Sequence, residues 1–583
     1  MSNRLNRIVA AFAVLAVATF SCLATGAMAD TCKRPLVGSD IKPPPDIYSQ
    51  NGVLSVTLDY FTTVDAWGRT LFCYVAPGGM ESPTLHVNPG DKIEIRLRNK
   101  EPTGALGSGV EQVSAGRVAC GSSTMMQTSI NIHFHGMNVK PRCHGDEVIH
   151  TIVNPGETFA YNFRVPTDEP PGLYWYHAHI HGIASPAVQG GASGAIEVEG
   201  IANLQPAVAG LPQRYLVFRD EPLAYPPKHG KVQHLVPFWD VSLNYVPIPY
   251  PYYKPAVIKM QAGAKEFWRF VNASADTVAD IKVLYDGKPQ PLQIVAFDGV
   301  PTGSQDGTHK GTIITQSDIL VPTAGRVEFI VTGPSAGVKE ARLITERIDT
   351  GPAGDVDTQR PLANIRLTTN LNDIPKPVVT PVAGNVPGDR FADVDDSMVT
   401  AHRLLFFCEL PIGGCGREVP AGKHPPSGGT TFFITVNGQQ NEAYQVNEPP
   451  KIVTYKGAVE DWTIENRAQE IHEFHIHQIH FQVIAVNGVP VPEKKRQWYD
   501  TYQVGYWDGK SKRYPSITVR MDFRGDVVGE FVYHCHILDH EDGGMMANIL
   551  VLPASGGGGP THQASAAGGK VKKASAGGTA TRA

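Results

Sequence analysis

The sequence predicts an all-β fold, and three observations carry that prediction. Short runs rich in Val, Ile, Phe and Tyr recur along the 583 residues, each bounded by Gly or Pro. No long stretch has the apolar period of a helix, and residues 85–99, 265–274, 326–334 and 460–468 alternate apolar with polar side chains. Three of these runs end in Asn followed by a polar turn, which indicates three related β-domains.

The predicted domain order begins with a secretory signal peptide at residues 1–29. Arg4 and Arg7 precede an apolar run, residues 8–20, that is too short to span a bilayer, and Ala27-Met28-Ala29 fits a cleavage site. Three domains of ordinary size are expected at 30–200, 201–377 and 378–553, with boundaries in Pro- and Gly-rich segments. Residues 554–583, rich in Gly, Ala and Ser, are expected to be disordered.

Seven cysteines follow the predicted signal peptide, an odd number for an exported protein. Six of them can form up to three disulfides in an oxidising compartment, and we expect Cys120 to pair with Cys143 and Cys408 with Cys415. The seventh, Cys535, lies between two histidines and is expected to be free. These features predict a periplasmic or secreted protein.

The charge pattern excludes some partners. Lys and Arg nearly balance Asp and Glu, and the net charge of −5 gives no basic field of the kind that nucleic-acid binding requires. Nothing in the sequence indicates a membrane partner or an obligate oligomer, so a monomer is expected.

Four histidine-rich segments dominate the sequence, namely HFHG at 133–136, HAHIH at 177–181, HEFHIH at 472–477 and HCHILDHEDGGM at 534–545. A random order of the 21 histidines would give roughly one His-x-His pair, whereas the sequence has five. Residues i and i+2 of a strand share a face, so each pair directs two imidazoles the same way. One such pair could be a solvated strand face, but four clusters with a cysteine indicate metal sites.

The last cluster is the most specific of the four. Cys535, His540 and Met545 supply a thiolate, an imidazole and a thioether, which together with the distant His472 is the ligand set of a blue-copper site. Eight further imidazoles, if they converge, could hold three more copper ions. These are His133, His135, His177, His179, His475, His477, His534 and His536.

This set of motifs resembles the three-domain, laccase-like multicopper oxidases, which are built from cupredoxin repeats, over nearly all of the mature chain. The resemblance implies four copper ions and fills every ligand position of the family pattern. The type 1 copper would be bound by His472, Cys535, His540 and, axially, Met545, and the type 2 copper by His133 and His475. The two type 3 coppers would be bound by His135, His177 and His536, and by His179, His477 and His534. His181 and His480 fall outside the pattern and are expected to have supporting or surface roles.

Reduction of dioxygen to water consumes protons, so acids near the copper cluster are needed. The resemblance implies Glu541, next to a predicted ligand, and Asp146, after the first cluster, as proton-relay candidates. Glu473 stands where the family commonly has Pro, and it could contact a substrate, accepting a phenol proton or attracting a cation. A carboxylate facing solvent is the alternative at Glu473 and at Glu541.

The resemblance therefore implies one-electron oxidation of a small-molecule or metal-ion donor, coupled to four-electron reduction of O₂ to water. An axial Met predicts a moderate type 1 potential. Phenolic donors are the leading expectation. The first alternative is oxidation of a metal ion such as Cu(I) for copper tolerance, which the low count of 11 Met with no Met-rich run disfavours. The second is a non-catalytic protein that binds or buffers copper.

Overall fold

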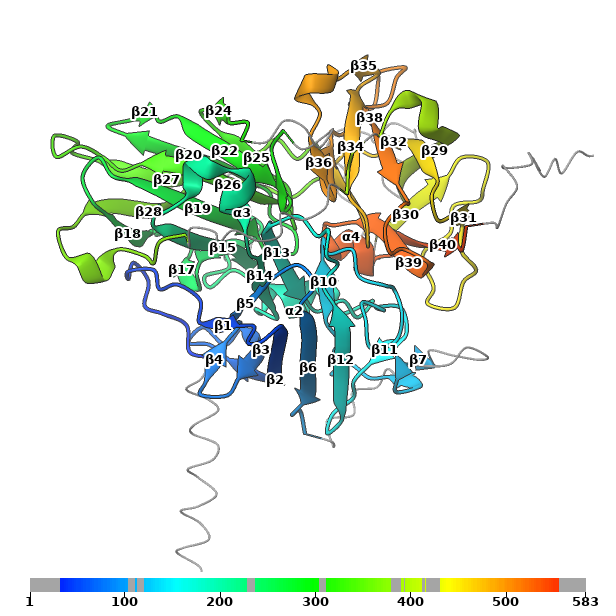
Figure 1. Cartoon of the computed structure of the whole chain (residues 1–583), viewed down its shortest axis with the longest axis horizontal. Helices are drawn as coiled ribbons and strands as arrows, with labels where there is room; N and C mark the ends of the chain where they lie inside the picture. Colours follow the sequence, from blue (N-terminus) through cyan, green and yellow to red (C-terminus); the bar gives the residue numbers. More distant parts are fainter. Residues whose placement is uncertain are drawn as a thin grey trace, which may run out of the picture.

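The computed structural model describes residues 32–102, 111–112, 120–227, 236–303, 311–378, 390–392, 394–410, 415 and 430–554. The predicted signal peptide, nearly all of the predicted tail and the Pro-rich residues 379–389 lie outside them. The regular secondary structure of the described chain is almost entirely strand, so the all-β prediction is confirmed (Figure 1). Its strands form three pairs of larger sheets, called below the first (46–198), middle (213–367) and last (399–552) sheet pairs.

The first sheet pair encloses its core between two five-stranded sheets. One sheet has the order β1 (Asp46–Tyr48), β5 (Thr84–Val87), β14 (Ser193–Val198), β13 (Gly172–His177) and β10 (His133–His135). The other has the order β12 (Thr158–Arg164), β6 (Lys92–Asn99), β2 (Val53–Val64), β3 (Thr70–Ala76) and β4 (Met80–Glu81). Two short ribbons pair β7 (Glu111–Gln112) with β9 (Thr124–Met125), and β8 (Cys120–Gly121) with β11 (Thr151–Ile152).

The middle sheet pair has an eight-stranded and a six-stranded sheet around a second core. The larger contains β17 (Val246–Ile248), β16 (Asp240–Leu243), β15 (Gln213–Glu221), β19 (Lys265–Asn272), β26 (Arg326–Thr332), β22 (Leu292–Phe297), β23 (Val300–Pro301) and β24 (Ile314–Gln316). The smaller contains β18 (Ala256–Met260), β28 (Arg360–Leu367), β27 (Ala341–Thr345), β20 (Ala279–Tyr285), β21 (Lys288–Pro289) and β25 (Ile319–Val321).

The last sheet pair has a seven-stranded and a five-stranded sheet around a third core. The larger contains β30 (Thr431–Val436), β29 (Val399–Leu410), β32 (Val459–Asn466), β38 (Ser516–Asp522), β34 (Phe481–Val486), β35 (Val489–Pro490) and β36 (Trp498–Tyr499). The smaller contains β31 (Ile452–Tyr455), β40 (Met546–Leu552), β39 (Gly529–Cys535), β33 (His472–Ile476) and β37 (Thr501–Val504).

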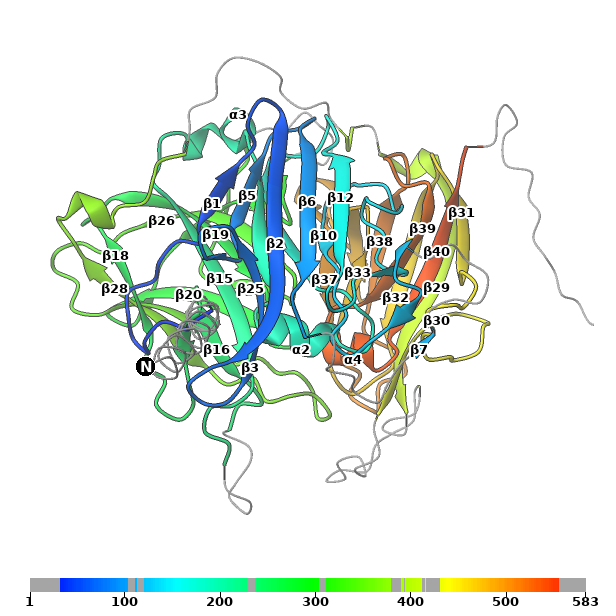
Figure 2. The same cartoon turned by 90° about the horizontal axis from the view of Figure 1, so that it is seen from below.

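The helices of the described ranges are few and short. They are α2 (Ala184–Gln189), α3 (Ile201–Leu204) and α4 (Leu538–Asp542), with single 3₁₀ turns at Pro206–Val208, Leu371–Asp373, Asp396–Met398 and Glu493–Lys495. Helices α2 and α4 lie side by side where the first and last sheet pairs meet (Figure 2). None of the helices in the described ranges is long and apolar enough to cross a membrane.

The repeated strand-Asn pattern has a structural cause. Asn99, Asn272 and Asn466 end β6, β19 and β32, and each is at most 1 % exposed. Each side-chain amide donates to two backbone carbonyls, and each amide oxygen accepts the N–H of the residue two positions on. The same buried turn therefore closes the same strand in all three sheet pairs.

The cysteine pairing agrees with the prediction. Disulfides join Cys120 to Cys143 and Cys408 to Cys415, and a third joins Cys32 to Cys73. Cys535 is free and buried.

Candidate metal centre

Eight histidines from the first and last sheet pairs converge where these two parts meet. Alternation along the strands directs His133 and His135 of β10 to one face, and the register places His133 opposite His177. In the last sheet pair, His475 of β33 lies opposite His534 of β39. All eight side chains are at most 1 % exposed. They are called the eight-histidine set below: His133, His135, His177, His179, His475, His477, His534 and His536.

Three rings of this set point their nitrogens at a common centre. The Nε2 atoms of His179, His477 and His534 lie 3.1, 3.2 and 3.3 Å from one another. Three ring nitrogens at this spacing surround a single point equally, as the ligands of one metal ion do. These three residues are the set predicted to bind one type 3 copper.

Other rings are fixed through one nitrogen while the second stays without a hydrogen bond. The Nδ1 atoms of His133, His177 and His475 lie 2.9, 2.8 and 2.8 Å from the Asp146 carboxylate, a neighbouring backbone carbonyl and the Asp500 carbonyl. Their Nε2 atoms are buried and have no hydrogen-bond partner in the described part of the chain. Burial, and then the surrounding histidines, hold the pKa of His133 well below its usual value. Neutral rings with a free buried nitrogen fit metal ligation.

A second, smaller centre lies within the last sheet pair. The Sγ atom of Cys535 lies 3.6 Å from Nδ1 of His472 and 3.7 Å from Nδ1 of His540, and the two nitrogens are 3.0 Å apart. Met545 is fully buried in the same core. A thiolate and two imidazoles in a triangle, with a thioether nearby, are the donor set of a blue-copper site. The residues present therefore fit the predicted type 1 copper.

Two carboxylates that sequence reasoning missed contact the outer sides of these two rings. Oε1 of Glu409 lies 3.0 Å from Nε2 of His472, and Oε1 of Glu470 lies 3.2 Å from Nε2 of His540. Both acids are at least 90 % enclosed by the protein. No local motif marks them, because Glu409 comes from β29 and Glu470 from the turn before β33. They lie on the side of the rings opposite to the cysteine.

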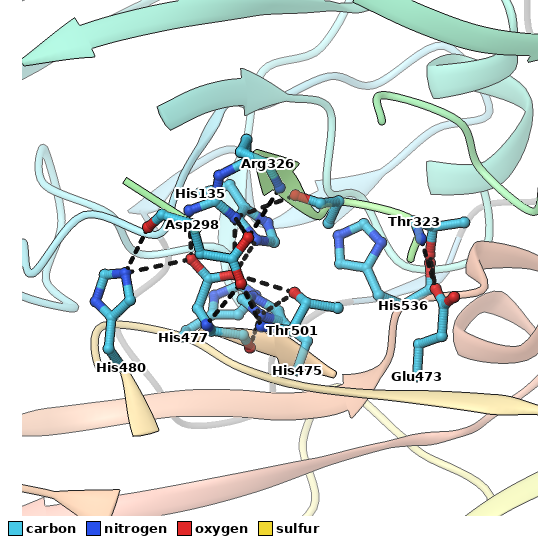
Figure 3. Close-up of polar contacts among 12 residues, drawn as sticks. His135, Asp298, Thr323, Arg326, Glu473, His475, His477, His480, Thr501 and His536 are labelled. Carbon is cyan, nitrogen blue, oxygen red and sulfur yellow. Dashed lines mark hydrogen bonds and ion pairs between the residues drawn. The ribbon is translucent and has the colours of Figure 1, made fainter. Parts of the chain in front are cut away.

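Glu473 does not face solvent, which corrects one alternative from the sequence. It is fully buried, and its carboxylate accepts two hydrogen bonds from Thr323 (Figure 3). The backbone N–H of Thr323 donates at 2.8 Å, and the Thr323 hydroxyl also donates to the same oxygen. Its own backbone N–H donates to Cys535 Sγ at 3.4 Å, and its carbonyl accepts from His536 N–H at 2.8 Å. Burial raises the pKa of Glu473 to about 8. The enclosed carboxyl therefore supports the Cys535 segment through these contacts.

Asp146 lies beside the eight-histidine set. Its carboxylate accepts from His133 Nδ1–H at 2.9 Å and from the Gln478 amide at 2.6 Å. The side chain is 1 % exposed, and burial raises its pKa well above the usual value.

Glu541, on α4, is fully buried near two other members of the set. Its carboxyl oxygens lie 3.7 Å from Nδ1 of His179 and 3.9 Å from Nδ1 of His534, and neither oxygen has a hydrogen-bond partner among the described residues. Burial, and then the charge of Asp542, raise the pKa of Glu541 well above its usual value. The solvent-facing alternative for Glu541 is therefore wrong, and burial favours the protonated form of its carboxyl.

The two histidines outside the family pattern lie at the edges of the centre. His480 is buried and donates from Nε2 to the Asp298 carbonyl at 2.8 Å. His181 packs against Tyr444, with ring centres 4.9 Å apart, and borders a small apolar cavity next to His179. Burial lowers the pKa of both histidines to about 4.

Sequence reasoning also missed a buried ion pair, Arg326 with Asp500, beside His135 and His475 of the eight-histidine set. Asp500 contacts His135 and His475, and Arg326 of the middle sheet pair holds it in place. The residues are separated by 174 and 365 positions along the chain, so no spacing rule connects them. The only local signal is Gly136, which ends the HFHG motif.

Comparisons with known proteins agree with this site. Two multicopper oxidase family models match residues 105–202 and 423–555, which contain all four histidine clusters. A multicopper oxidase of Mycobacterium tuberculosis is 24% identical over 88% of this chain and 86% of its own length.

Solved structures show the same fold. A metallo-oxidase from Campylobacter jejuni superposes with a TM-score of 0.60 at 22% identity, covering 89% of this chain and 96% of the other. A laccase-like oxidase from Ochrobactrum, described as active on lignin model compounds, superposes with a TM-score of 0.59 at 17% identity, covering 88% and 100%.

Proposed function

Because the chain belongs to the multicopper oxidase family, we propose that it couples one-electron oxidation of a donor at the Cys535 centre to reduction of O₂ to water at the eight-histidine set. One observation carries this proposal. Cys535 ends β39 and lies between His534 and His536 in the chain, so its sulfur faces one centre while both neighbouring imidazoles face the other. Two covalently adjacent centres allow electrons that enter at one to leave at the other.

The residues that would hold copper are those with converging or unpartnered ring nitrogens. Bound copper would supply the one-electron steps and the site of O₂ reduction. The mononuclear type 1 ion would be bound by His472, Cys535, His540 and Met545. The type 2 ion would be bound by His133 and His475. The type 3 pair would be bound by His135, His177 and His536, and by His179, His477 and His534.

The chain itself would manage the protons and exclude water. Glu541 and Asp146 lie within hydrogen-bonding or near-contact distance of the set, and burial favours their protonated forms. Glu541 is the better candidate donor because its oxygens are free, whereas the Asp146 carboxylate orients His133. The complete burial of the eight rings would exclude bulk solvent from the proposed site of O₂ reduction.

For the donor, the structure favours a hard metal cation over the phenol that the sequence suggested first. Glu409 and Glu470 contact the outer nitrogens of both predicted type 1 histidines. Carboxylates bind cations such as Fe²⁺ and Mn²⁺, while Cu⁺ prefers thioether and thiolate ligands, and the chain has no Met-rich run. A cation held here would be one hydrogen bond from the type 1 ligands.

A phenolic donor remains the second candidate. The same two carboxylates could accept the proton that a phenol loses when it is oxidised. The two donor classes place different demands on the carboxylates. Binding a cation requires the negative charge of the carboxylate, whereas oxidation of a phenol requires only a group that accepts the proton.

The test is oxygen uptake by the copper-loaded protein with Fe²⁺, Mn²⁺ or guaiacol as the donor, in the wild type and in Glu470→Gln. We expect the variant to lose about 10- to 100-fold in kcat/KM for the metal ion, the cost of a charge-assisted contact, and to change little with guaiacol. Glu448→Gln, which removes a carboxylate paired with Lys451, is the matched control.

The outcomes separate the three hypotheses. A loss confined to guaiacol would favour the phenol oxidase, and an equal loss with both donors would contradict a charge-specific cation site. Full copper loading without oxygen uptake from any donor would identify a copper-binding protein without catalysis.

We also propose that the domain boundaries follow the sheet pairs, at 30–200, 201–377 and 378–553, and that the protein acts as a monomer outside the cytoplasm. Three disulfides support an oxidising compartment.

A further inference from the structure

The middle sheet pair supplies none of the predicted copper ligands, yet its side chains reach the eight-histidine set. Asp298 follows β22 in the turn to β23, and Arg326 is the first residue of β26. Figure 3 shows both side chains gathered against His135 and His475. Asp298 and Arg326 are almost fully buried, at 2 % and 1 % exposed, so stability requires that their polar atoms find partners inside the protein.

Arg326 connects all three sheet pairs. Its NH1 and NH2 groups donate to the two carboxylate oxygens of Asp500 at 2.8 and 2.5 Å, a bidentate pair with the last sheet pair. Its Nε–H donates to the Leu173 carbonyl of the first sheet pair at 3.3 Å. Its NH1 also donates to the Ala324 carbonyl, so the guanidinium has a partner at each nitrogen. Only a planar fork of donors can satisfy this set of acceptors.

Asp500 transmits this constraint to two predicted ligands. Its Oδ1 atom accepts a hydrogen bond from His135 Nε2–H at 3.0 Å, which leaves His135 Nδ1 without a partner. Its backbone carbonyl accepts from His475 Nδ1–H at 2.8 Å, which leaves His475 Nε2 free. One residue therefore sets the tautomer and the orientation of both rings. Thr501 adds a hydroxyl contact to the Asp500 carboxylate at 3.0 Å.

The surroundings leave the ion pair no room to move. Asp298 accepts from the backbone N–H groups of Arg326 and Asp500 at 2.8 and 3.1 Å, joining the two backbones directly. On the other side, a Cβ at Gly136 would lie 2.4 Å from NH2 of Arg326 and 2.6 Å from Oδ2 of Asp500. This close approach, at a φ of +85°, explains the glycine that ends the HFHG motif.

We propose that Arg326 is a positioning residue for the copper cluster: through Asp500 it holds His135 and His475 in the orientation that binds metal. The inference rests on the copper assignment proposed above. Replacement of Arg326 would weaken binding of the type 2 ion most, because His475 is one of only two protein ligands predicted for it. The type 3 ion bound by His135 keeps two other imidazoles.

The test compares Arg326→Lys with Arg269→Lys. Arg269 is the matched control because it is also fully buried in the middle sheet pair, and its guanidinium bridges Glu197 of the first sheet pair and Glu328 at 2.7 and 2.9 Å. Both variants keep the positive charge and lose the fork of donors. Only Arg326 is connected to a predicted ligand.

We expect Arg326→Lys to weaken retention of type 2 copper by about 10- to 100-fold, the usual effect of losing a partner that orients a metal-bound histidine. The readouts are copper per chain against a competing chelator, the type 2 signal in electron paramagnetic resonance, and the blue absorption of the type 1 site. In Arg326→Lys the type 2 signal falls while the blue absorption stays. In Arg269→Lys both stay, even if the unfolding temperature falls equally.

Two results would overturn the inference: full type 2 copper in Arg326→Lys, or the same copper loss in both variants. Asp500→Asn is the second variant, since an amide can orient His135 through its oxygen but cannot form the bidentate ion pair with the guanidinium. It should lose type 2 copper as Arg326→Lys does. If the wild type itself binds no type 2 copper, the copper assignment fails instead, so the two failures are distinguishable.

Discussion

The two predicted copper centres are built in different ways. The ligands of the mononuclear centre all come from the last sheet pair, and Cys535 and Met545 belong to its core. The eight-histidine set takes four rings from the first sheet pair and four from the last, and its buried ion pair comes partly from the middle one. The first centre thus depends on the folding of one sheet pair, whereas the second depends on the docking of three.

Replacing Cys535 by Ser has the largest expected effect, because it removes the thiolate of the mononuclear centre at the residue that joins the two centres along the chain. The thiolate is the strongest predicted ligand of the mononuclear centre, and its backbone links that centre to His534 and His536. We expect both the blue absorption and oxygen uptake to fall to background. Absorption spectra and oxygen uptake of the copper-loaded variant check this, and a variant that stays blue would contradict the type 1 assignment.

Replacing His477 by Ala tests whether the mononuclear centre binds copper independently of the eight-histidine set. The Nε2 atom of His477 lies within 3.2 Å of those of His179 and His534, so its loss opens the predicted type 3 ligand triangle. The mononuclear centre lies in a core that this change does not reach, so we expect the blue absorption to remain while oxygen uptake falls to background. His181→Ala is the control, because this nearby ring is outside the predicted ligand set. Loss of the blue absorption in His477→Ala would show that the two centres are not independent.

Glu541→Gln tests whether the residue between the first and last sheet pairs delivers protons, without removing a predicted copper ligand. The amide keeps the size of the side chain but cannot deliver a proton. We expect all copper to be retained and kcat to fall by about 10²- to 10⁴-fold, the usual worth of a positioned acid. Steady-state oxygen uptake with a saturating donor measures it. Unchanged turnover would mean that protons reach the cluster by another route.

Local patterns in the sequence were enough to predict the all-β fold and the four alternating runs that form strands. The His-x-His spacing works because strand alternation is a property of a few adjacent residues. The repeated strand-Asn pattern predicted related units for the same reason, since Asn99, Asn272 and Asn466 each bond to their own turn. What depends on neighbours in the chain can be read from the chain.

The groups around the ligands could not be predicted in this way. Glu409, Glu470 and Arg326 meet their histidine or aspartate partners only after separate strands, or separate sheet pairs, have packed. Glu473 shows the reverse error, because its position beside His472 suggested a role at the surface. Its partner, Thr323, comes from the middle sheet pair and buries it. Packing between strands of one sheet pair decided the contacts of Glu409 and Glu470, and docking between sheet pairs decided those of Arg326 and Glu473. Neither leaves a periodic signal in the sequence.

The smallest predicted effect tests that docking directly. Asp542, in α4 of the last sheet pair, accepts the backbone N–H groups of Gly182 at 2.6 Å and Ser185 at 2.9 Å, so it caps the start of α2 in the first sheet pair. Asp542→Ala should cost about 1 kcal/mol of stability, the usual value of a lost cap, whereas Asp542→Asn keeps an acceptor and should cost less. Chemical denaturation of both variants measures the difference.

Because the Asp542 contact joins the two halves of the eight-histidine set, Asp542→Ala should also release the copper of that set before the type 1 copper as denaturant rises. Simultaneous release from both centres would show that the three sheet pairs unfold as one unit, and the contrast between the two centres would then concern their ligands and not their stability.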